Sequence, residues 1–351
     1  MKVAIVGFGF IAEKGHLPAY RARGDVRVTA VVDPITSRRA AALRQYRDIR
    51  VYESFSDLLE EYSQEIDIID VCLPNSLHQD AVRQGLKAQK HVVCERPMAL
   101  SLGEYDELVK LAKEQKRLLY PCHASKFAPS VVHASYLISS GEIGEPLFAS
   151  FNVFAGGYPQ GIPQWNPNWR RDKSIAGGGI MMDFGLDALS MAQTLFGGSP
   201  QRISAHIRNL QKGENQLEDL ATFCLDWEDK LINVNLSLLG DSMGKSSYRI
   251  QGTKGEITIE NNDVFLSKKG KPVEHTFVPT YFDDPAHSNW FNGLIDDMMG
   301  TINSGNLEPY VLQEAALALE VIDKTYQSSN NGGSWLPIDF VPKSVRAIAN
   351  S

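Results

Sequence analysis

The chain has few cysteines, and they do not form the pattern of a disulfide scaffold or a structural zinc site. Its four cysteines, Cys72, Cys94, Cys122 and Cys224, show no CxxC spacing among 351 residues. This excludes a disulfide-dense secreted domain and favours buried free thiols. We therefore expect a reducing, cytoplasmic location.

Long apolar runs are also missing. No stretch approaches the roughly 18 apolar residues that a membrane helix needs, and the first apolar run breaks at Gly7. The start of the chain therefore does not resemble a signal peptide, whose apolar segment is longer. The sequence predicts no membrane partner.

An excess of basic residues is absent as well. The chain has 35 basic and 42 acidic residues, a formal net charge of −7. This balance argues against a general nucleic-acid-binding surface. The length of 351 residues exceeds what one hydrophobic core usually serves. We expect two domains and no nucleic-acid partner.

A glycine-rich turn near the start is the most informative segment. The apolar run from Lys2 to Val6 ends on Gly7-Phe8-Gly9-Phe10-Ile11-Ala12, where a helical stretch begins. In such a GxGxxA turn the first glycine permits the tight turn, and the second lets a pyrophosphate approach the backbone. The N–H groups at the start of the helix then face the phosphates. We expect Gly7, Phe8, Gly9, Phe10 and Ile11 to bind a dinucleotide.

Strand-like and helical runs alternate from residue 1 to about residue 122. The expected strands after the first cover Val26 to Val32, Ile66 to Cys72, His91 to Cys94 and Leu118 to Tyr120, and the helical runs between them include Thr36 to Arg47 and Leu77 to Lys87. Such alternation predicts an α/β fold with a doubly wound parallel sheet, a Rossmann domain over residues 1–122. Ligands bind such sheets beyond the carboxyl ends of the strands.

The choice between NAD and NADP depends on the end of the second predicted strand. Asp33 stands there, where a carboxylate accepts hydrogen bonds from the adenosine ribose and repels a 2′-phosphate. Arg38 and Arg39 follow closely and could meet such a phosphate instead. We expect NAD as cofactor, with NADP possible.

Several motifs stand in a fixed order along the chain. They read Pro74-Asn75-Ser76-Leu77-His78, Glu95-Arg96-Pro97, Trp169-Arg170-Arg171-Asp172, Gly177-Gly178-Gly179 and Asp183-Phe184-Gly185. They resemble the PNxxH, E-K-P, WR, GGG and D-x-G segments of the glucose-fructose oxidoreductase, inositol dehydrogenase and rhizopine-catabolism family (Gfo/Idh/MocA). The resemblance covers essentially the whole chain.

The resemblance implies a Rossmann domain followed by an α/β domain with a large, mostly antiparallel sheet over residues 123–351. One face of that sheet commonly supports dimers or tetramers, so we expect a homo-oligomer. Strand-like runs between Ile203 and Glu260 agree with this fold. The resemblance also places Pro74, Asn75, His78, Glu95 and Arg96 near the cofactor.

Both residues that usually handle protons in the family are changed here. The family's E-K-P lysine, which assists proton movement near the nicotinamide, is Arg96, and its usual histidine after D-x-G is Asp187. A guanidinium stays protonated at any working pH, so Arg96 can hold charge but transfers protons poorly.

Three accounts of these changes are open. In the first, Asp187 is the acid/base and Arg96 its electrostatic partner. In the second, the substrate is a conjugated or imine-like acceptor that needs little proton assistance. In the third, the protein is a non-catalytic dinucleotide-binding sensor or regulatory protein.

The substrate site is less well defined by the sequence. Asp183 and Asp187 are four residues apart and share a helix face, but no histidine joins them, so we expect no metal. Asp183 is a catalytic or substrate-binding candidate. The other substrate-binding candidates are His123, Lys126, Trp169 and Arg170.

The sequence thus predicts an NAD(P)-dependent oxidoreductase that transfers a hydride between nicotinamide C4 and a small polar substrate. A sugar, a cyclitol or a sugar derivative is the expected substrate. A redox-neutral epimerase or glycoside-eliminating enzyme with tightly bound NAD is the alternative on the same scaffold.

Overall fold

The computed structural model describes residues 1–46, 48–211, 217–240, 245–278 and 288–340. The chain forms two compact units. Unit 1 comprises Met1–Ala124, Gln160–Gly177 and Asp283–Leu312, and unit 2 comprises Ser125–Pro159, Gly178–Phe282 and Gln313–Ser351. These units are defined by packing, and the domain boundary expected between residues 122 and 123 stays a prediction.

Unit 1 is built around a six-stranded parallel sheet with the order β3-β2-β1-β4-β5-β6. Its strands are β1 (Lys2–Val6), β2 (Arg27–Val32), β3 (Arg50–Tyr52), β4 (Ile68–Val71), β5 (His91–Cys94) and β6 (Leu119–Pro121). The central strands are rich in Val and Ile and are almost wholly buried, as a parallel sheet covered on both faces requires. The strand order reverses between β1 and β4, the place where doubly wound folds bind ligands. The predicted Rossmann fold is confirmed.

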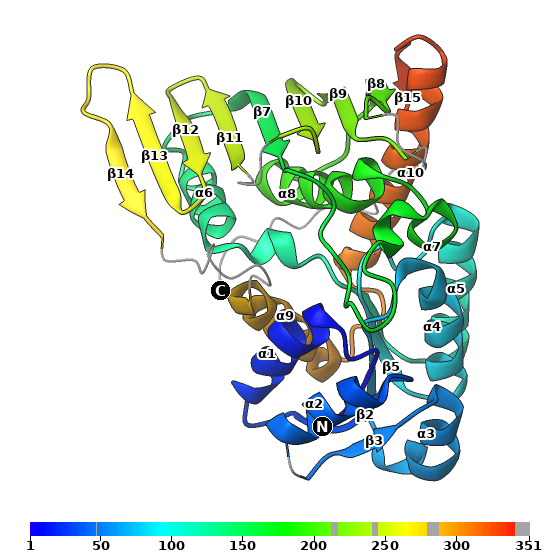
Figure 1. The fold of residues 1–351 in the computed structure, drawn as a ribbon. Coiled ribbons are helices and arrows are strands. Elements are labelled where there is room, and N and C mark those ends of the chain that lie inside the picture. The colour runs from blue at the N-terminus through cyan, green and yellow to red at the C-terminus, as the bar shows by residue number, and fades with distance from the viewer. Residues whose placement is uncertain (47, 212–216, 241–244, 279–287, 341–351) are drawn as a thin grey trace. The chain divides into compact units, whose positions relative to one another are not determined.

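Helices cover both faces of this sheet (Figure 1). On one face lie α1 (Leu17–Arg21), α2 (Thr36–Gln45) and α9 (Ser288–Ser304), and on the other α3 (Phe55–Tyr62), α4 (His78–Lys87) and α5 (Leu102–Gln115). The helix that enters α1 begins with a π-helical turn, η1 (Ala12–His16). Two 3₁₀ turns, η2 (Ser63–Glu65) and η3 (Asn75–Leu77), complete the order up to β5.

The segment from Gly156 to Gly179 is rich in Pro, Trp, Asn and Gly, a composition that predicts a long loop. The structure shows short helices within it. They are the 3₁₀ turn η5 (Trp169–Arg171) and α7 (Lys173–Ala176). Asp172 caps α7, because its Oδ1 accepts the N–H of Ser174 at 2.9 Å. Gly177, with a φ of +83°, ends the helix in the left-handed conformation.

Unit 2 contains a nine-stranded sheet with the order β14-β13-β12-β11-β7-β10-β9-β8-β15. Its strands are β7 (Pro146–Phe154), β8 (Arg202–Arg208), β9 (Leu220–Trp227), β10 (Lys230–Ser237), β11 (Lys245–Gly252), β12 (Gly255–Glu260), β13 (Asp263–Lys268), β14 (Glu274–Phe277) and β15 (Leu336–Pro337). Only β7 and β10 pair in parallel among the described strands of this sheet. The predicted large, mostly antiparallel sheet is confirmed.

Helices lie on one face of the unit 2 sheet (Figure 1). They are α6 (Pro129–Ser139), α8 (Leu186–Phe196) and α10 (Tyr310–Asn330), with the 3₁₀ turn η4 (Ala124–Phe127) before α6 and the π-helical turn η6 (Met181–Gly185) before α8. Along β7 the side chains alternate, with Phe151 buried and Asn152 half-buried. In the described part of the chain, no helix covers the second face.

A polar ladder crosses that second face. The amide of Asn235 donates to Asn152 Oδ1 at 2.9 Å, and the hydroxyl of Thr222 donates to Asn235 Oδ1 at 2.8 Å. The face also carries exposed apolar side chains, for example Phe154 and Leu231. The sheet therefore presents a flat surface of mixed polarity.

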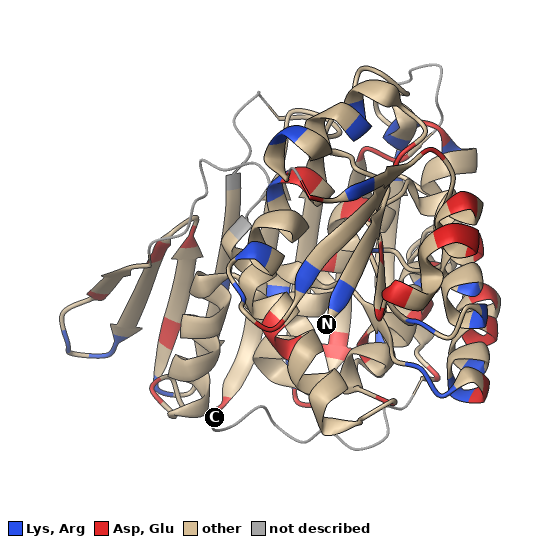
Figure 2. Cartoon of the chain, turned by 90° about the horizontal axis from the view of Figure 1, so that it is seen from below, with Lys and Arg blue, Asp and Glu red and all other residues tan. Residues whose placement is uncertain are grey.

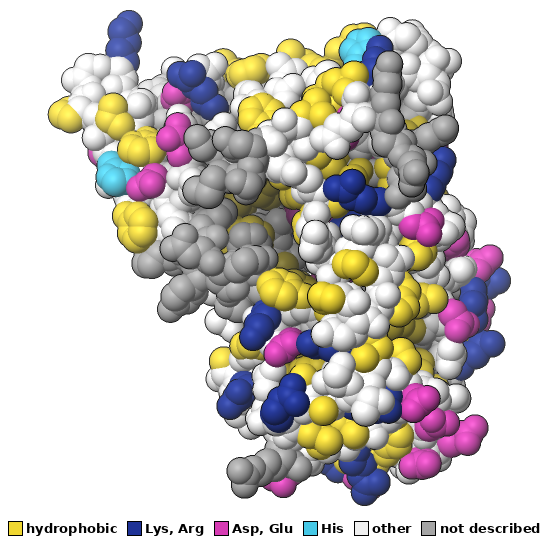
Figure 3. Space-filling model, in the orientation of Figure 1, with side chains coloured by type: hydrophobic (Ala, Val, Ile, Leu, Met, Phe, Trp, Pro, Cys, Tyr) yellow, Lys and Arg dark blue, Asp and Glu magenta, His cyan; other side chains and the backbone are white. Residues whose placement is uncertain are grey.

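Charges of both signs are interspersed along the chain (Figure 2). On the face shown in Figure 3, acidic side chains gather over the helices of unit 1, and Asp57, Glu60 and Glu61 of α3 are exposed. Among the described residues, no helix combines the length and apolar character needed to cross a membrane.

Candidate active site

The glycine-rich turn after β1 has one filled side and one open side. Gly7 has a φ of +91°, and a Cβ there would lie 2.7 Å from the carbonyl oxygen of Cys72, so only glycine fits. A Cβ on Gly9 would meet no heavy atom within 4 Å. The buried ring of Phe8 anchors the turn, whereas Phe10 is 43% exposed. The turn therefore leaves free space where the backbone begins the helix, as a pyrophosphate requires.

Asp33 connects the end of β2 to this turn. Its Oδ2 accepts the N–H of Phe8 at 2.9 Å, and its Oδ1 accepts the N–H of Ile35 at 2.8 Å. A carboxylate oxygen accepts more than one hydrogen bond. The buried Asp33 therefore fixes the turn and still has acceptor capacity for ribose hydroxyls.

Both arginines after β2 are engaged with unit 1. Arg38 donates from Nε to the carbonyl of Phe8 at 2.6 Å, and its guanidinium pairs with Glu13 at 2.6 Å. The same guanidinium lies over the Phe8 ring, with its Cζ 5.4 Å from the ring centroid. Arg39 donates to the carbonyl of Asp33 at 2.7 Å. These contacts partly neutralise the positive charges of Arg38 and Arg39, which a 2′-phosphate would otherwise meet.

The segment from Pro74 to His78 joins the ends of β4 and β5. His78 is buried, and its Nδ1 lies 2.7 Å from the carbonyl of Pro97 while its Nε2 lies 2.6 Å from the carbonyl of Leu73. Burial lowers the pKa of His78, although both carbonyls favour its proton. The amide of Asn75 donates to the carbonyl of Ala176, the last residue of α7, at 2.9 Å.

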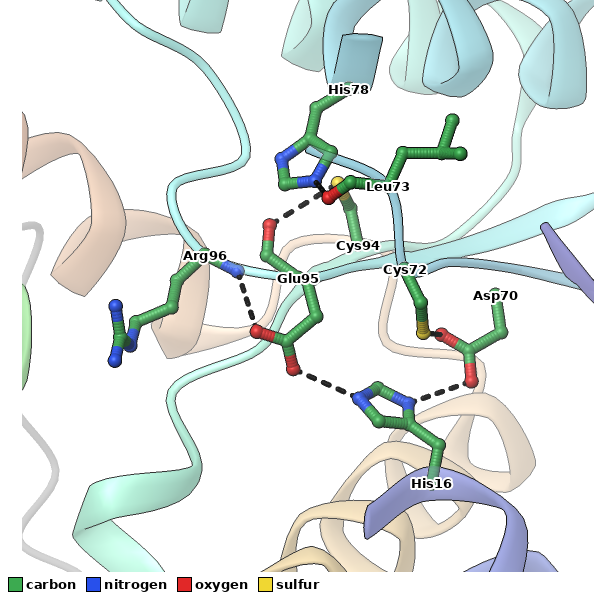
Figure 4. Close-up of polar contacts among 8 residues, drawn as sticks. All are labelled: His16, Asp70, Cys72, Leu73, His78, Cys94, Glu95 and Arg96. Atoms are coloured by element: carbon green, nitrogen blue, oxygen red, sulfur yellow. Dashed lines mark hydrogen bonds and ion pairs between the residues drawn. The ribbon is translucent and has the colours of Figure 1, made fainter. Parts of the chain in front are cut away.

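Glu95 and Arg96 follow β5. One carboxylate oxygen of Glu95 lies 2.9 Å from Nε2 of His16, and the other accepts the N–H of Arg96 at 3.2 Å. Burial alone would raise the pKa of Glu95, but the hydrogen bond and charge of His16, together with the charges of Arg96 and His78, outweigh burial and leave the pKa below its usual value. The Arg96 side chain extends away from that carboxylate (Figure 4), and the Arg96–Pro97 peptide bond is cis.

In unit 2, Asp183 lies in η6 and Asp187 in the first turn of α8, and both are half-buried. Burial raises the pKa of Tyr248 to about 12, and the negative charge of Asp187 contributes to this shift. Asp187 therefore acts electrostatically on a tyrosine of β11.

The helix that carries both aspartates is held by Glu218, which sequence reasoning missed. Glu218 is buried, and its Oε1 accepts the N–H groups of Gly179 at 2.8 Å and Met181 at 3.3 Å and the hydroxyl of Tyr326. Its carbonyl accepts the hydroxyl of Tyr158 at 2.8 Å. No local signal marks Glu218, because its partners are distant in sequence.

The substrate-binding candidates occupy different surroundings. His123 is buried just after β6, and Lys126 is buried and pairs with Glu314 at 2.8 Å. The Arg170 guanidinium stacks on the Trp169 ring at 4.3 Å from its centroid. Their contact with substrate stays a prediction.

Potential metal ligands cluster at a different place from Asp183 and Asp187. Two overlapping groups in unit 1 have ligand atoms within 4.8 Å of one another, His16 with Asp70 and Cys72, and His16 with Glu95 and Cys122. The protonation of His16 decides whether these groups can bind an ion.

Comparison with known proteins places the chain in a family. Residues 1–123 match the oxidoreductase family with an NAD-binding Rossmann fold, and residues 131–258 match the GFO/IDH/MocA C-terminal domain. The two matches together cover most of the chain.

Individual relatives share modest identity over long stretches. The chain is 27% identical to a D-glucoside 3-dehydrogenase of Escherichia coli, covering 95% of this chain and 96% of that protein. It is 26% identical to an NADP(+) D-xylose 1-dehydrogenase of Haloarcula marismortui, covering 79% of each.

A solved structure has the same fold. Levoglucosan dehydrogenase, in complex with NADH and levoglucosan, superposes with a TM-score of 0.83 at 18% identity, covering 97% of this chain and 99% of that one. With the open glycine turn, the six-stranded parallel sheet and both family matches in place, the chain belongs to the GFO/IDH/MocA family of oxidoreductases.

Proposed function

We propose that the protein is an NAD-dependent dehydrogenase or reductase acting on CH–OH or C=O groups of a sugar, a cyclitol or a sugar derivative. The observation that carries this proposal is the free space at Gly9, at the start of a helix and beside the buried Asp33. The named sugar dehydrogenases among the relatives support the substrate class.

The cofactor would lie along the carboxyl ends of the unit 1 strands. The residues proposed for its adenosine and pyrophosphate are Gly7, Phe8, Gly9, Phe10, Ile11, Asp33 and Arg38. Those proposed for its nicotinamide end are Pro74, Asn75, His78, Glu95 and Arg96. When bound, the nicotinamide supplies hydride chemistry at C4.

NAD is the proposed preference over NADP. The Asp33 carboxylate would repel a 2′-phosphate. Arg38, one of the two candidate cations, is already paired with Glu13. NADP stays possible, since Arg39 also lies near Asp33.

The proposed roles of Asp187 and Arg96 follow from the chemistry of their side chains. For alcohol oxidation, the Asp187 carboxylate would accept the proton of the substrate hydroxyl. Arg96 holds its positive charge throughout and stabilises alkoxide character in the transition state. Asp183 is proposed to bind substrate hydroxyls beside Asp187, and His123, Lys126, Trp169 and Arg170 complete the proposed substrate-binding set.

We propose a homo-oligomer, a dimer or a tetramer, formed through the uncovered face of the unit 2 sheet. The exposed Phe154 and Leu231 and the Asn152–Asn235 ladder on that face support this. Light scattering at several concentrations tests the oligomer, and a monomer throughout would contradict it.

A reducing, cytoplasmic location is proposed from the four free cysteines.

The experiment that tests the proposed function is a fluorescence titration of the purified protein with NADH and NADPH. The absorbance of the reduced nicotinamide is then followed with a panel of sugars and cyclitols. We expect tighter binding of NADH and turnover of at least one polyol or sugar. Tight binding without turnover on any member of this panel would contradict the proposal.

A further inference from the structure

His16 is a buried histidine that lies between two carboxylates of unit 1 (Figure 4). Its side chain is wholly inaccessible to solvent. Its Nδ1 lies 2.8 Å from Asp70 Oδ2, and its Nε2 lies 2.9 Å from Glu95 Oε1. Ionised carboxylates only accept hydrogen bonds, and a neutral imidazole carries one N–H. An imidazolium, which carries two, is therefore the form that satisfies both contacts.

The electrostatics of the cluster agree with this form. Burial alone would lower the pKa of His16, but the charges of Asp70 and Cys72 and the hydrogen bonds to them together outweigh burial and leave the pKa well above its usual value. Glu95 responds in the opposite direction: burial would raise its pKa, but the hydrogen bond and charge of His16, with the charges of Arg96 and His78, hold the pKa below its usual value. Both directions agree with the imidazolium–carboxylate pair that the two contacts require.

A metal ion fits this cluster poorly. A doubly protonated His16 offers no lone pair to an ion, and burial raises the pKa of the Cys72 thiol to about 12. Burial likewise raises the pKa of the Cys122 thiol. Since metals bind thiolate and neutral imidazole, an ion would have to displace the protons of His16 and of a thiol to bind here.

The surroundings hold His16 rigidly. It lies in the π-helical turn η1, a form that often occurs at functional sites. Its ring packs on Phe291 of α9, with 4.6 Å between ring centroids. A Cβ on the preceding Gly15 would lie 2.7 Å from that phenyl ring, so glycine lets α9 approach. Asp70 belongs to the central strand β4 and is also wholly buried.

We propose that His16 is a positioning residue that holds Glu95 and thereby fixes the backbone of Arg96. The connection runs from Asp70 through the His16 ring to Glu95 Oε1, and from Glu95 Oε2 to the N–H of Arg96. This inference rests on the proposed function, in which Arg96 stabilises the reacting oxygen. It assigns a role in the site to a residue of the first helix.

Two substitutions separate the two contacts of His16. The amide nitrogen of Asn stands near the place of Nδ1, whereas that of Gln stands near Nε2. His16→Asn therefore keeps a donor for Asp70 and removes the one for Glu95, and His16→Gln does the reverse. Both remove the charge and disturb the same buried site. Tyr20→Phe is the matched control, because Tyr20 is buried near Asp70, and burial and the charge of Asp70 both raise its pKa, yet it does not touch Glu95 in the contacts described.

The kinetic result expected is a loss specific to His16→Asn. Its kcat should fall by about 10- to 100-fold, the cost of misplacing a group by roughly an ångström. The Kd for NADH should stay within about threefold, since the glycine turn is untouched. His16→Gln should lose less than about tenfold in kcat, and Tyr20→Phe should behave as wild type.

Hydrogen exchange supplies a readout that does not require turnover. Exchange at the Arg96 amide, within a peptide covering residues 94–99, should become faster in His16→Asn than in His16→Gln. Thermal unfolding of both variants shows whether they are folded and equally destabilised. Metal content is measured on the same wild-type sample.

The outcomes separate this inference from the proposed function. Equal kcat and equal Arg96 exchange in the two folded variants would overturn the positioning role, as would a stoichiometric metal in wild type that His16 substitutions remove. If wild type turns over no substrate, the proposed function fails. The exchange difference then still decides whether His16 holds the Arg96 backbone.

Discussion

Each unit contains a glycine-rich turn that leads into a helix, but the two turns have different surroundings. In unit 1 a glycine-rich turn leads into the π-helical turn η1 and then α1, and in unit 2 another leads into η6 and then α8. In each, a buried carboxylate accepts backbone N–H groups of the turn, Asp33 in the first and Glu218 in the second. The difference lies in the space beside the glycines.

That space is open in unit 1 and filled in unit 2. A Cβ on Gly9 would meet nothing within 4 Å, whereas one on Gly179 would lie 2.4 Å from the Glu218 carbonyl oxygen. The positive end of a helix attracts an anion, whether the anion belongs to a ligand or to a side chain of the protein. Unit 1 leaves room for an external phosphate, and unit 2 supplies its own carboxylate. The same turn thus serves binding in one unit and support of Asp183 and Asp187 in the other.

The largest expected effect is the loss of the internal carboxylate. Glu218→Ala leaves the N–H groups of Gly179 and Met181 and the hydroxyl of Tyr326 without this acceptor. We expect the free energy of unfolding to fall by about 3 kcal/mol or more, since each unsatisfied buried group costs about 1–3 kcal/mol. Urea denaturation measures it.

Asp33→Ala is the matched change in unit 1. It removes an acceptor from the N–H groups of Phe8 and Ile35 at a turn that has open space beside it. We expect a smaller loss of stability, because water can reach the freed groups. An equal or larger fall in the free energy of unfolding of Asp33→Ala would contradict the proposed difference between the two turns.

The next effect concerns the open side of the unit 1 turn. Gly9→Val places a side chain in the space proposed for the pyrophosphate. We expect the Kd for NADH to rise about 100-fold, which corresponds to about 2.7 kcal/mol, with the thermal midpoint unchanged. Fluorescence titration and thermal unfolding of the same samples give both values.

Gly179→Ala is the counterpart in unit 2. Its added methyl group must displace Glu218 or the Tyr158 hydroxyl, so stability should fall by about 1–3 kcal/mol. The Kd for NADH should stay at the wild-type value. If Gly179→Ala weakened NADH binding and Gly9→Val did not, the assignment of the two turns would be reversed.

The smallest effect is a pH dependence specific to Glu95. Its folded pKa lies below the ordinary value of 4.5, so its ionisation stabilises the folded state above that value. This contribution is lost as the pH falls through the folded pKa. The unfolding free energies of wild type and Glu95→Gln should therefore converge in acid, as followed by urea titrations from neutral pH downward. A gap that widened in acid would contradict the imidazolium–carboxylate pair.

Local patterns predicted much of unit 1. The strand at His91–Cys94 coincides with its prediction, and the Gly7 to Ala12 turn lies between strand and helix as expected. Both depend on neighbours in sequence. The short strand β3, the third strand of the predicted alternation, was not located, because three residues give too little periodicity. The helices inside 156–179 were also missed, although Asp172 and Gly177 are cap residues.

The support of the site could not be predicted in the same way. Glu218 meets Tyr326 at a separation of 108 residues, and His16 meets Glu95 at a separation of 79. No periodicity connects such pairs, since only the fold brings them together. The same applies to Lys126, whose ammonium pairs with Glu314. The sequence predicted the candidate catalytic and binding residues. Tertiary packing determines which other side chains support them.

The proposed role of Asp187 as general base is tested by the rate of nicotinamide reduction. The rate is measured for wild type and for Asp187→Asn with a sugar or cyclitol that wild type oxidises. The account predicts that the variant loses about 100-fold or more in kcat, the usual range for a lost general base. Its Kd for NADH should stay within about twofold of wild type. A wild-type rate in the Asp187→Asn protein would contradict the account.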